Sequence, residues 1–92
     1  MIVWENEHPL IHFREENQTY HLDVRPLLEE GGEPYPFIVA CVHQIQAEDT
    51  LIIHSLFEPK PLLKVILDMG YQVLAERVGE DHWHTTVAAA NR

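Results

Sequence analysis

The fold of this chain is decided by two stretches of sequence, Leu22-Asp23-Val24-Arg25-Pro26-Leu27 and Glu33-Pro34-Tyr35-Pro36-Phe37. The first completes a segment, beginning at Tyr20, in which apolar and polar side chains alternate, as is typical of a β-strand. The second opens an apolar run with two prolines, which suit the first turn of a helix because the N–H groups they lack have no intrahelical partner there. Pro26 and the Glu29-Glu30-Gly31-Gly32 cluster predict a flexible loop between them. We therefore expect a strand, a loop and a helix over residues 34–46.

Four further elements are expected along the chain. They are a strand over Thr50–His54, a helix over residues 60–69 that is started by Glu58-Pro59-Lys60-Pro61, and two strands over Tyr71–Val78 and Trp83–Val87 joined by a hairpin turn. The order β-α-β-α-β-β predicts an α+β fold, a two-layer α/β sandwich with both helices on one face of a four-stranded sheet. The expected core consists of Phe37, Cys41, Val42, Leu51, Ile53, Leu62, Ile66, Val73, Trp83 and Val87.

Three segments are expected: an N-terminal extension over residues 1–19, a domain over residues 20–87 and a tail over residues 88–92. In the extension, Ile2-Val3-Trp4 and Leu10-Ile11-His12-Phe13 could form a β-hairpin that extends the sheet or covers its open face. We expect it to be ordered, because leaving its apolar surface in water costs about 25 cal/mol per Å². It could pair with the sheet edge of its own chain, or with that of a second copy to make a homodimer. The tail is expected to be frayed.

Size and charge limit the classes of function. Ninety-two residues with 46% hydrophobic content suit one compact domain. The net charge is −9 and the six basic residues are scattered, which argues against nucleic acid and anionic membranes as partners because both need clustered Lys and Arg. No apolar run reaches the roughly 18 residues of a membrane span, and the first residues lack the pattern of a signal peptide. A cytoplasmic location is expected.

The single cysteine, Cys41, excludes an internal disulfide and a CxxC motif. It lies at helical spacing from Phe37, Ile38, Val42 and Ile45, which indicates a buried structural thiol.

A strand that ends in Asp-x-Arg, followed by a helix that starts with Pro-x-Pro, resembles the TusA/SirA-like family of small sulfur carriers. In that family a cysteine directly before Pro-x-Pro carries the persulfide, and here Glu33 occupies the matching position. The chain is more similar to a cysteine-less bacterial branch of that group, a domain of unknown function sometimes found beside hemerythrin-like domains. The features that carry this similarity are Leu22–Leu27, the helix start Glu58–Leu62 and the strand around Trp83. The resemblance covers residues 20–87 and implies a TusA-like fold.

The residues considered for partner binding are Asp23, Arg25, Glu33, Pro34, Pro36, Pro59, Lys60 and Pro61. A carboxylate at Glu33 would be stabilised at a helix N-terminus by roughly 0.3–1 kcal/mol; alternatively it contacts a basic partner or a metal. Asp23 and Arg25 could form an ion pair that holds the following loop. Alternatively, Arg25 and Lys60 border an anion site near the two helix N-termini.

Seven histidines in 92 residues are the strongest hint of site chemistry. His82 and His84 share one face of a predicted strand, opposite Trp83, and His21 shares a face with Asp23, opposite Leu22. If the helices cover the Leu22 and Trp83 side, these histidines line the uncovered side. His21, His82 and His84 are therefore candidate ligands of a divalent transition metal such as Zn²⁺, Ni²⁺, Cu²⁺ or Fe, although a known ligand signature is lacking. The alternative is that they are exposed strand histidines without a ligand. His8, His12, His43 and His54 are too scattered to assign.

These features support three hypotheses. The first is a non-enzymatic TusA-like module without a cofactor that docks onto a redox, sulfur or nitrogen-oxide enzyme, because the scaffold is retained and its carrier thiol is absent. The second is a metal- or haem-associated protein that uses the histidine face. The third is an enzyme with a small-molecule site at the helix N-termini, where Glu33 acts as acid or base. Sulfur relay is not expected, because Glu33 cannot hold a persulfide.

Overall fold

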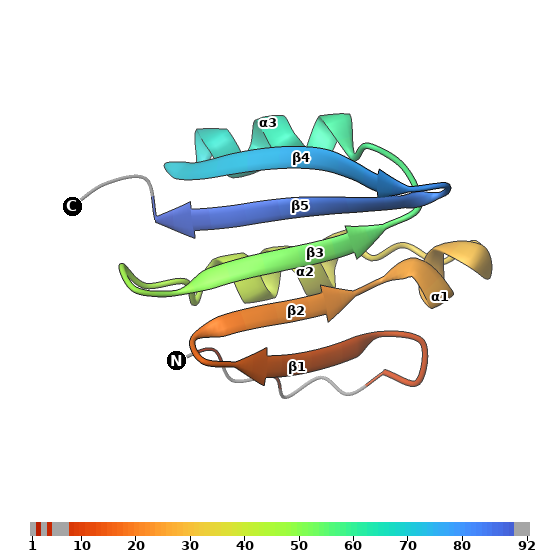
Figure 1. Cartoon of the computed structure of the whole chain (residues 1–92), viewed down its shortest axis with the longest axis horizontal. Helices are drawn as coiled ribbons and strands as arrows, with labels where there is room; N and C mark the ends of the chain where they lie inside the picture. Colours follow the sequence, from red (N-terminus) through yellow and green to blue (C-terminus); the bar gives the residue numbers. More distant parts are fainter. Residues whose placement is uncertain (1, 3, 5–7, 90–92) are drawn as a thin grey trace.

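The computed structural model describes residues 2, 4 and 8–89 as an α+β fold, a five-stranded mixed sheet with three helices (Figure 1). The elements are β1 (His12–Glu16), β2 (Thr19–Asp23), α1 (Arg25–Glu29), α2 (Tyr35–Val42), β3 (Thr50–Ser55), α3 (Lys60–Asp68), β4 (Tyr71–Gly79) and β5 (His82–Ala89). The strand order is β1-β2-β3-β5-β4. Only the β2–β3 pair is parallel, and the other three pairs are antiparallel.

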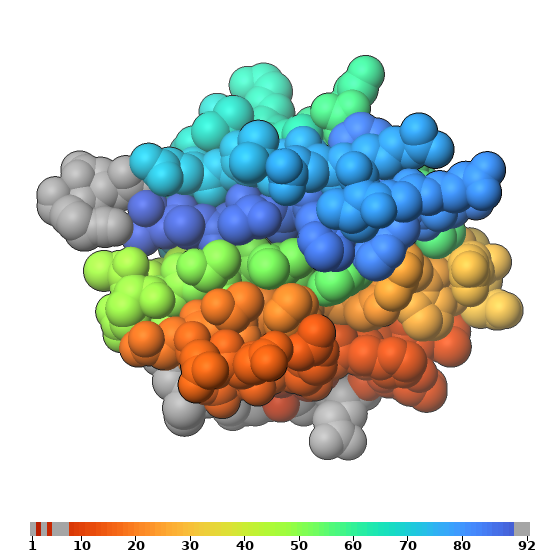
Figure 2. Space-filling model, viewed as in Figure 1, coloured from red at the N-terminus to blue at the C-terminus, as the bar shows by residue number. Residues whose placement is uncertain are grey.

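The helices leave one face of the sheet uncovered, and we call this side, away from α2 and α3, the open face. In Figure 1, α2 and α3 lie behind the strands, and Figure 2, viewed from the same side, shows strands without a helix in front of them. Burial agrees with this arrangement: on β3, Leu51 and Ile53 are buried, whereas Ile52 and His54, which alternate with them, are only half-buried. The predicted two-layer arrangement is therefore confirmed, with a fifth strand added.

The predicted core is largely confirmed. Seven of its members are buried, namely Cys41, Val42, Leu51, Ile53, Leu62, Ile66 and Val87. Phe37, Val73 and Trp83 are half-buried. The N-terminal part adds buried Ile2 and Ile11, and Trp4 stacks on Phe13 with ring centroids 5.6 Å apart. The prediction that this segment is ordered is therefore confirmed at Ile2, at Trp4 and from His8 onward. Val3 and residues 1 and 5–7 lie outside the described residues.

The N-terminal hairpin extends the sheet, which was one of the two expected alternatives. Its strands, β1 and β2, flank a two-residue turn at Asn17 and Gln18, whose φ angles are 53° and 65°. Positive φ at both turn residues matches the twist of the flanking strands. The hairpin therefore crosses the boundary expected at residue 19, and the strand that pairs with β1 is β2 rather than the segment around Ile2.

The segment predicted as a flexible loop after the first strand contains a short helix, α1. Gly31 ends this helix with a φ of 81°, its N–H donates to the carbonyl of Leu28, and the N–H of Gly32 donates to the carbonyl of Leu27. This pair of bonds is the Schellman motif, which satisfies the last carbonyls of a helix. Leu27 is buried against the core. The glycines that predicted a flexible loop therefore terminate helix α1.

Helix α2 ends at Val42, about one turn earlier than predicted. The N–H groups of Gln44 and Ile45 bond to carbonyls three residues back, so the last turn is tighter than an α-helix. The carboxylate of Asp49 then accepts the N–H of Gln46 and turns the chain into β3.

The C-terminal hairpin is confirmed and is longer than predicted. Asp81 has a φ of 56° in the turn, and β5 continues through Ala88 and Ala89, which pair with Gln72 and Tyr71. The fraying expected from residue 88 is therefore wrong for these two residues, and residues 90–92 lie outside the described residues. Among the helices described, α3 is the longest with nine residues, and none has the length and hydrophobicity needed to cross a bilayer.

Candidate metal centre

One row of residues crosses the open face of the sheet on all five strands. In strand order it consists of His12, Asp23, His54, His84 and Glu76, each directly paired with the next. Side chains of directly paired residues point to the same side of a sheet. Strand pairing, rather than closeness in sequence, therefore brings these ionisable groups together.

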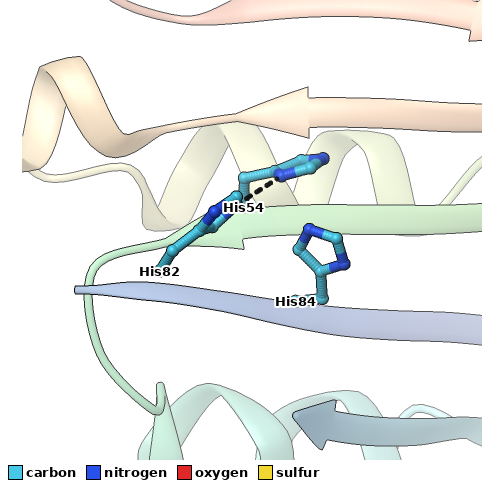
Figure 3. A group of neighbouring side chains, drawn as sticks. All are labelled: His54, His82 and His84. Carbon is cyan, nitrogen blue, oxygen red and sulfur yellow. Dashed lines mark hydrogen bonds between the residues drawn. The ribbon is translucent and has the colours of Figure 1, made fainter. Parts of the chain in front are cut away.

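Three imidazoles converge near the middle of this row. His54 extends from β3, and His82 and His84 extend from β5 (Figure 3). One ring nitrogen of each lies within 4.8 Å of one nitrogen of the other two. His54 Nδ1 is 3.0 Å from His82 Nε2. Nitrogens that share a tetrahedral ion at bond lengths of about 2.0–2.1 Å are about 3.3 Å apart, so the cluster could hold a metal ion after small ring movements.

His21 lies beside this cluster and contacts it through His54. Its Nδ1 is 3.0 Å from Nε2 of His54, on the opposite edge of the ring from the nitrogen that approaches His82. His54 is thus hydrogen-bonded on both ring nitrogens. Of the predicted ligands, His82 and His84 belong to the group of three, whereas His21 is placed to orient His54.

The environment favours neutral imidazoles, the form that binds metals. Burial, reinforced by the neighbouring His84, lowers the pKa of His54 from 6.5 to about 4. Burial and then the Arg25 guanidinium lower the pKa of His82, and burial and then Arg14 lower the pKa of His21. At neutral pH the rings of His54, His82 and His21 therefore present lone pairs and not positive charge.

Asp23 and Arg25 form the ion pair that was one of the two predicted alternatives. The Arg25 guanidinium donates to both carboxylate oxygens of Asp23 at 3.0 and 2.7 Å, and the Arg25 backbone N–H donates to Oδ1 at 3.1 Å. Burial alone would raise the pKa of Asp23, but the bonds from Arg25 outweigh burial and lower it. The pair joins the end of β2 to the start of α1 and lies beside the histidines.

The other candidate binding residues lie on a different part of the molecule. Glu33, Pro34, Pro59 and Pro61 line a cavity of about 290 Å³ between the starts of α2 and α3, which we call the helix-start cavity. Neither Arg25 nor Lys60 lines it, so this cavity offers no support for the predicted anion site between these two residues. Pro36 and Lys60 are exposed nearby in sequence.

Glu33 has a local structural role. Its Oε2 accepts the backbone N–H of Tyr35 at 2.9 Å, at the first residue of α2. The carboxylate thus satisfies one of the N–H groups that a helix start leaves free. The prediction of an acid in the first turn is wrong in position, because Glu33 lies before Pro34 and Tyr35, although its carboxylate still bonds to a free N–H at the helix start.

Cys41 belongs to neither site. Its side chain is fully buried, and burial raises the pKa of its thiol to about 12. The prediction of a buried structural thiol is confirmed.

A model of the family described as "Uncharacterized conserved protein (DUF2249)" matches residues 21–89. The match covers about three-quarters of the chain, which therefore belongs to this family. It spans the four clustered histidines and both candidate sites. No curated protein and no solved structure matches the chain. The link to the TusA/SirA-like carriers stays a prediction.

The residue that sequence reasoning missed is His54. The alternation of Thr50–Ser55 contained a usable signal: Leu51 and Ile53 face the helices, so His54 faces the side opposite to them. What the sequence lacked was the register, which sets His54 directly between Asp23 and His84.

Proposed function

We propose that this protein binds a divalent transition-metal ion through His54, His82 and His84. The observation that carries the proposal is the convergence of three ring nitrogens within 4.8 Å of one another on the open face. Imidazole suits Zn²⁺, Cu²⁺, Ni²⁺ and iron, and burial lowers the pKa of His54 and of His82, which favours their neutral, metal-binding form. A bare ion fits the arrangement better than haem, because haem iron takes its protein ligands along one axis rather than from three converging rings.

His21 supports the proposal from outside the ligand set. When His54 binds an ion through Nδ1, its Nε2 carries the proton and can donate it to Nδ1 of His21, at the observed 3.0 Å. Hydrogen bonds of this kind orient the rings of metal-binding histidines. Three protein ligands leave a fourth position of a tetrahedral ion for an exchangeable ligand, as in zinc sites that act on small molecules.

The test is metal titration of protein made without a histidine tag and stripped with a chelator. Calorimetry should give one strong Zn²⁺ or Co²⁺ site per chain. Replacing His54 or His84 by Gln should weaken binding by more than the 10–100-fold that is typical when a residue that only orients a ligand is lost. The matched control is His43→Gln, because His43 is exposed beyond α2, outside the cluster. Unchanged affinity in the cluster variants, or no strong site in the native protein, would refute the proposal.

Protein binding at the helix-start cavity is a second candidate function. It corresponds to the hypothesis of a TusA-like module that docks onto a redox, sulfur or nitrogen-oxide enzyme. The favouring observation is apolar surface at the cavity: Phe57 is 54% and Tyr35 is 39% exposed, and both line it. Exposed aromatic side chains beside a pocket are typical anchors of protein interfaces.

A photo-crosslinking residue at position 57 tests this second candidate. The matched control is the same residue at position 67, because Leu67 is 56% exposed on α3 and does not line the cavity. A discrete product from position 57 alone, abolished by Tyr35→Ser, supports docking at the cavity. A product formed equally from both positions contradicts it, and a product at twice the chain mass would identify the partner as a second copy.

A further inference from the structure

The histidine cluster adjoins a cavity of about 330 Å³ on the side of β1 and β2. Its walls are formed by His12, Phe13, Arg14, His21, Asp23, Arg25, His54 and His82. Two of the three candidate ligands, His54 and His82, are therefore walls of this cavity, and an ion held between them lies beside it. We propose that the cavity binds a small oxyanion, a carboxylate or a phosphate, that coordinates the bound metal ion and pairs with Arg14 and Arg25. This inference rests on the proposed metal binding.

The charge distribution supports an anion. The chain has only six basic side chains in a net charge of −9, yet two guanidinium groups line this single cavity. Asp23 is the one carboxylate among the lining residues, and a divalent ion would add two positive charges. Acidic Glu29, Glu80 and Asp81 line an adjoining hollow and do not line this cavity. The two share His12, Asp23 and Arg25.

Both guanidinium groups can accept a further partner. Arg25 uses Nε and one nitrogen of its fork for Asp23, and a guanidinium has five N–H donors, so three donors are not used by that pair. Arg14 pairs with Glu16 at 3.0 Å, but the two side chains are 61% and 66% exposed, and such surface pairs contribute only about 0–1 kcal/mol. Arg14 can therefore exchange Glu16 for an anion in the cavity.

The two guanidinium groups line the same cavity as His21, His54 and His82. A negative charge placed in this cavity therefore lies close to both of them. Carboxylates and phosphates each present two oxygens that match the fork of a guanidinium, which makes them better candidates than spherical halides.

The test uses tag-free protein loaded with Co²⁺, whose visible absorption reports the ligands of the ion. Acetate and inorganic phosphate are titrated separately at constant ionic strength. The expected result is a saturable spectral change with at least one of them, which distinguishes the two sources. Arg14→Gln should weaken this anion binding by about tenfold, as expected for loss of a hydrogen bond to a charged group, while cobalt affinity stays unchanged.

Two further variants control for structure and charge. Asp23→Asn combined with Arg25→Gln removes the second guanidinium without leaving its carboxylate unpaired, and it should also weaken the anion by about tenfold. Arg77→Gln removes one positive charge from β4, away from the cavity, and should leave anion binding unchanged. Cobalt binding without any anion-dependent change overturns this inference and leaves the metal proposal standing. Absence of cobalt binding overturns both. Equal weakening by Arg14→Gln and Arg77→Gln, with none in the double variant whose net charge is unchanged, shows a general charge effect and overturns the anion site.

Discussion

Replacing His54 by Gln should make the stability of the metal-free protein less sensitive to acid. Burial holds the pKa of His54 at about 4 in the folded protein, below the 6.5 of an exposed imidazole. Between these two values the unfolded chain binds a proton that the folded protein does not bind, so acid favours unfolding. The stability that depends on neutral His54 is therefore fully present above about pH 6.5 and is lost as the pH falls through about 4.

The size of the effect comes from the same two values. A difference of one in pKa corresponds to about 1.4 kcal/mol, so the fall from 6.5 to about 4 sets an upper bound of about 3.4 kcal/mol. His54 is only half-buried, and water and the neighbouring rings can reorganise around a charged imidazole. We therefore expect about half of this bound, on the order of 1.5 kcal/mol.

Urea unfolding in a chelator, followed by tryptophan fluorescence, measures the free energy of unfolding at about pH 7.5 and about pH 4.5. Between these two pH values, the free energy of unfolding should fall further in the wild type than in His54→Gln, by on the order of 1.5 kcal/mol. His43→Gln, with its exposed side chain, should behave as the wild type does. Equal acid sensitivity of His54→Gln and the wild type would refute the argument that the folded protein keeps this ring neutral.

Three further predictions concern the scaffold. Thr85 is fully buried, and its hydroxyl has no hydrogen-bond partner among the described residues. Thr85→Val should therefore raise the free energy of unfolding, measured by urea titration, by about 1 kcal/mol. A loss of stability would show that the hydroxyl has a partner. Gly31→Ala should lower it by about 1 kcal/mol, because Gly31 has a φ of 81°, and a neutral result would mean that α1 is not needed for stability. When a persulfide-loaded cysteine desulfurase is added, buried Cys41 should gain no additional sulfur atom, as measured by intact mass. The Glu33→Cys variant should gain one. Near-stoichiometric labelling of Cys41 would contradict this prediction.

The parts of the fold that could be predicted are those whose signals are local. The alternation in Thr50–Ser55 and the proline pairs at the starts of α2 and α3 depend on neighbouring residues alone, and these elements are present. Helix α1 was missed because proline and glycine both interrupt and delimit helices. Pro26 lies in its first turn and Gly31 just past its end, and a helix of five residues is too short to show a helical period.

Only the part of the site that lies on a single strand could be predicted from the sequence. Alternation alone placed His82 and His84 on one face, and the structure keeps them there. His54 is 28 residues away from His82 and 33 from His21, and its position depends on the parallel β2–β3 pairing and the antiparallel β3–β5 pairing. Registers between distant strands are set by the packing of the whole core, which one sequence does not display.

The histidine cluster is hard to explain as a device for stability. The open face would tolerate threonine or charged side chains, as it does at Thr86 and Glu76, without the sensitivity to acid that His54 brings. Glu33 is different, because its carboxylate satisfies the first N–H of α2 and so has a structural use without any partner. A bound ion would more than offset this loss of stability. At a free concentration of about 100 times its dissociation constant, the ion stabilises the folded state by about 2.7 kcal/mol, which exceeds the stability expected to be lost in acid at His54. The proposed metal binding would therefore account for the imidazoles on this face, whereas the carboxylate of Glu33 already has a structural use without a ligand.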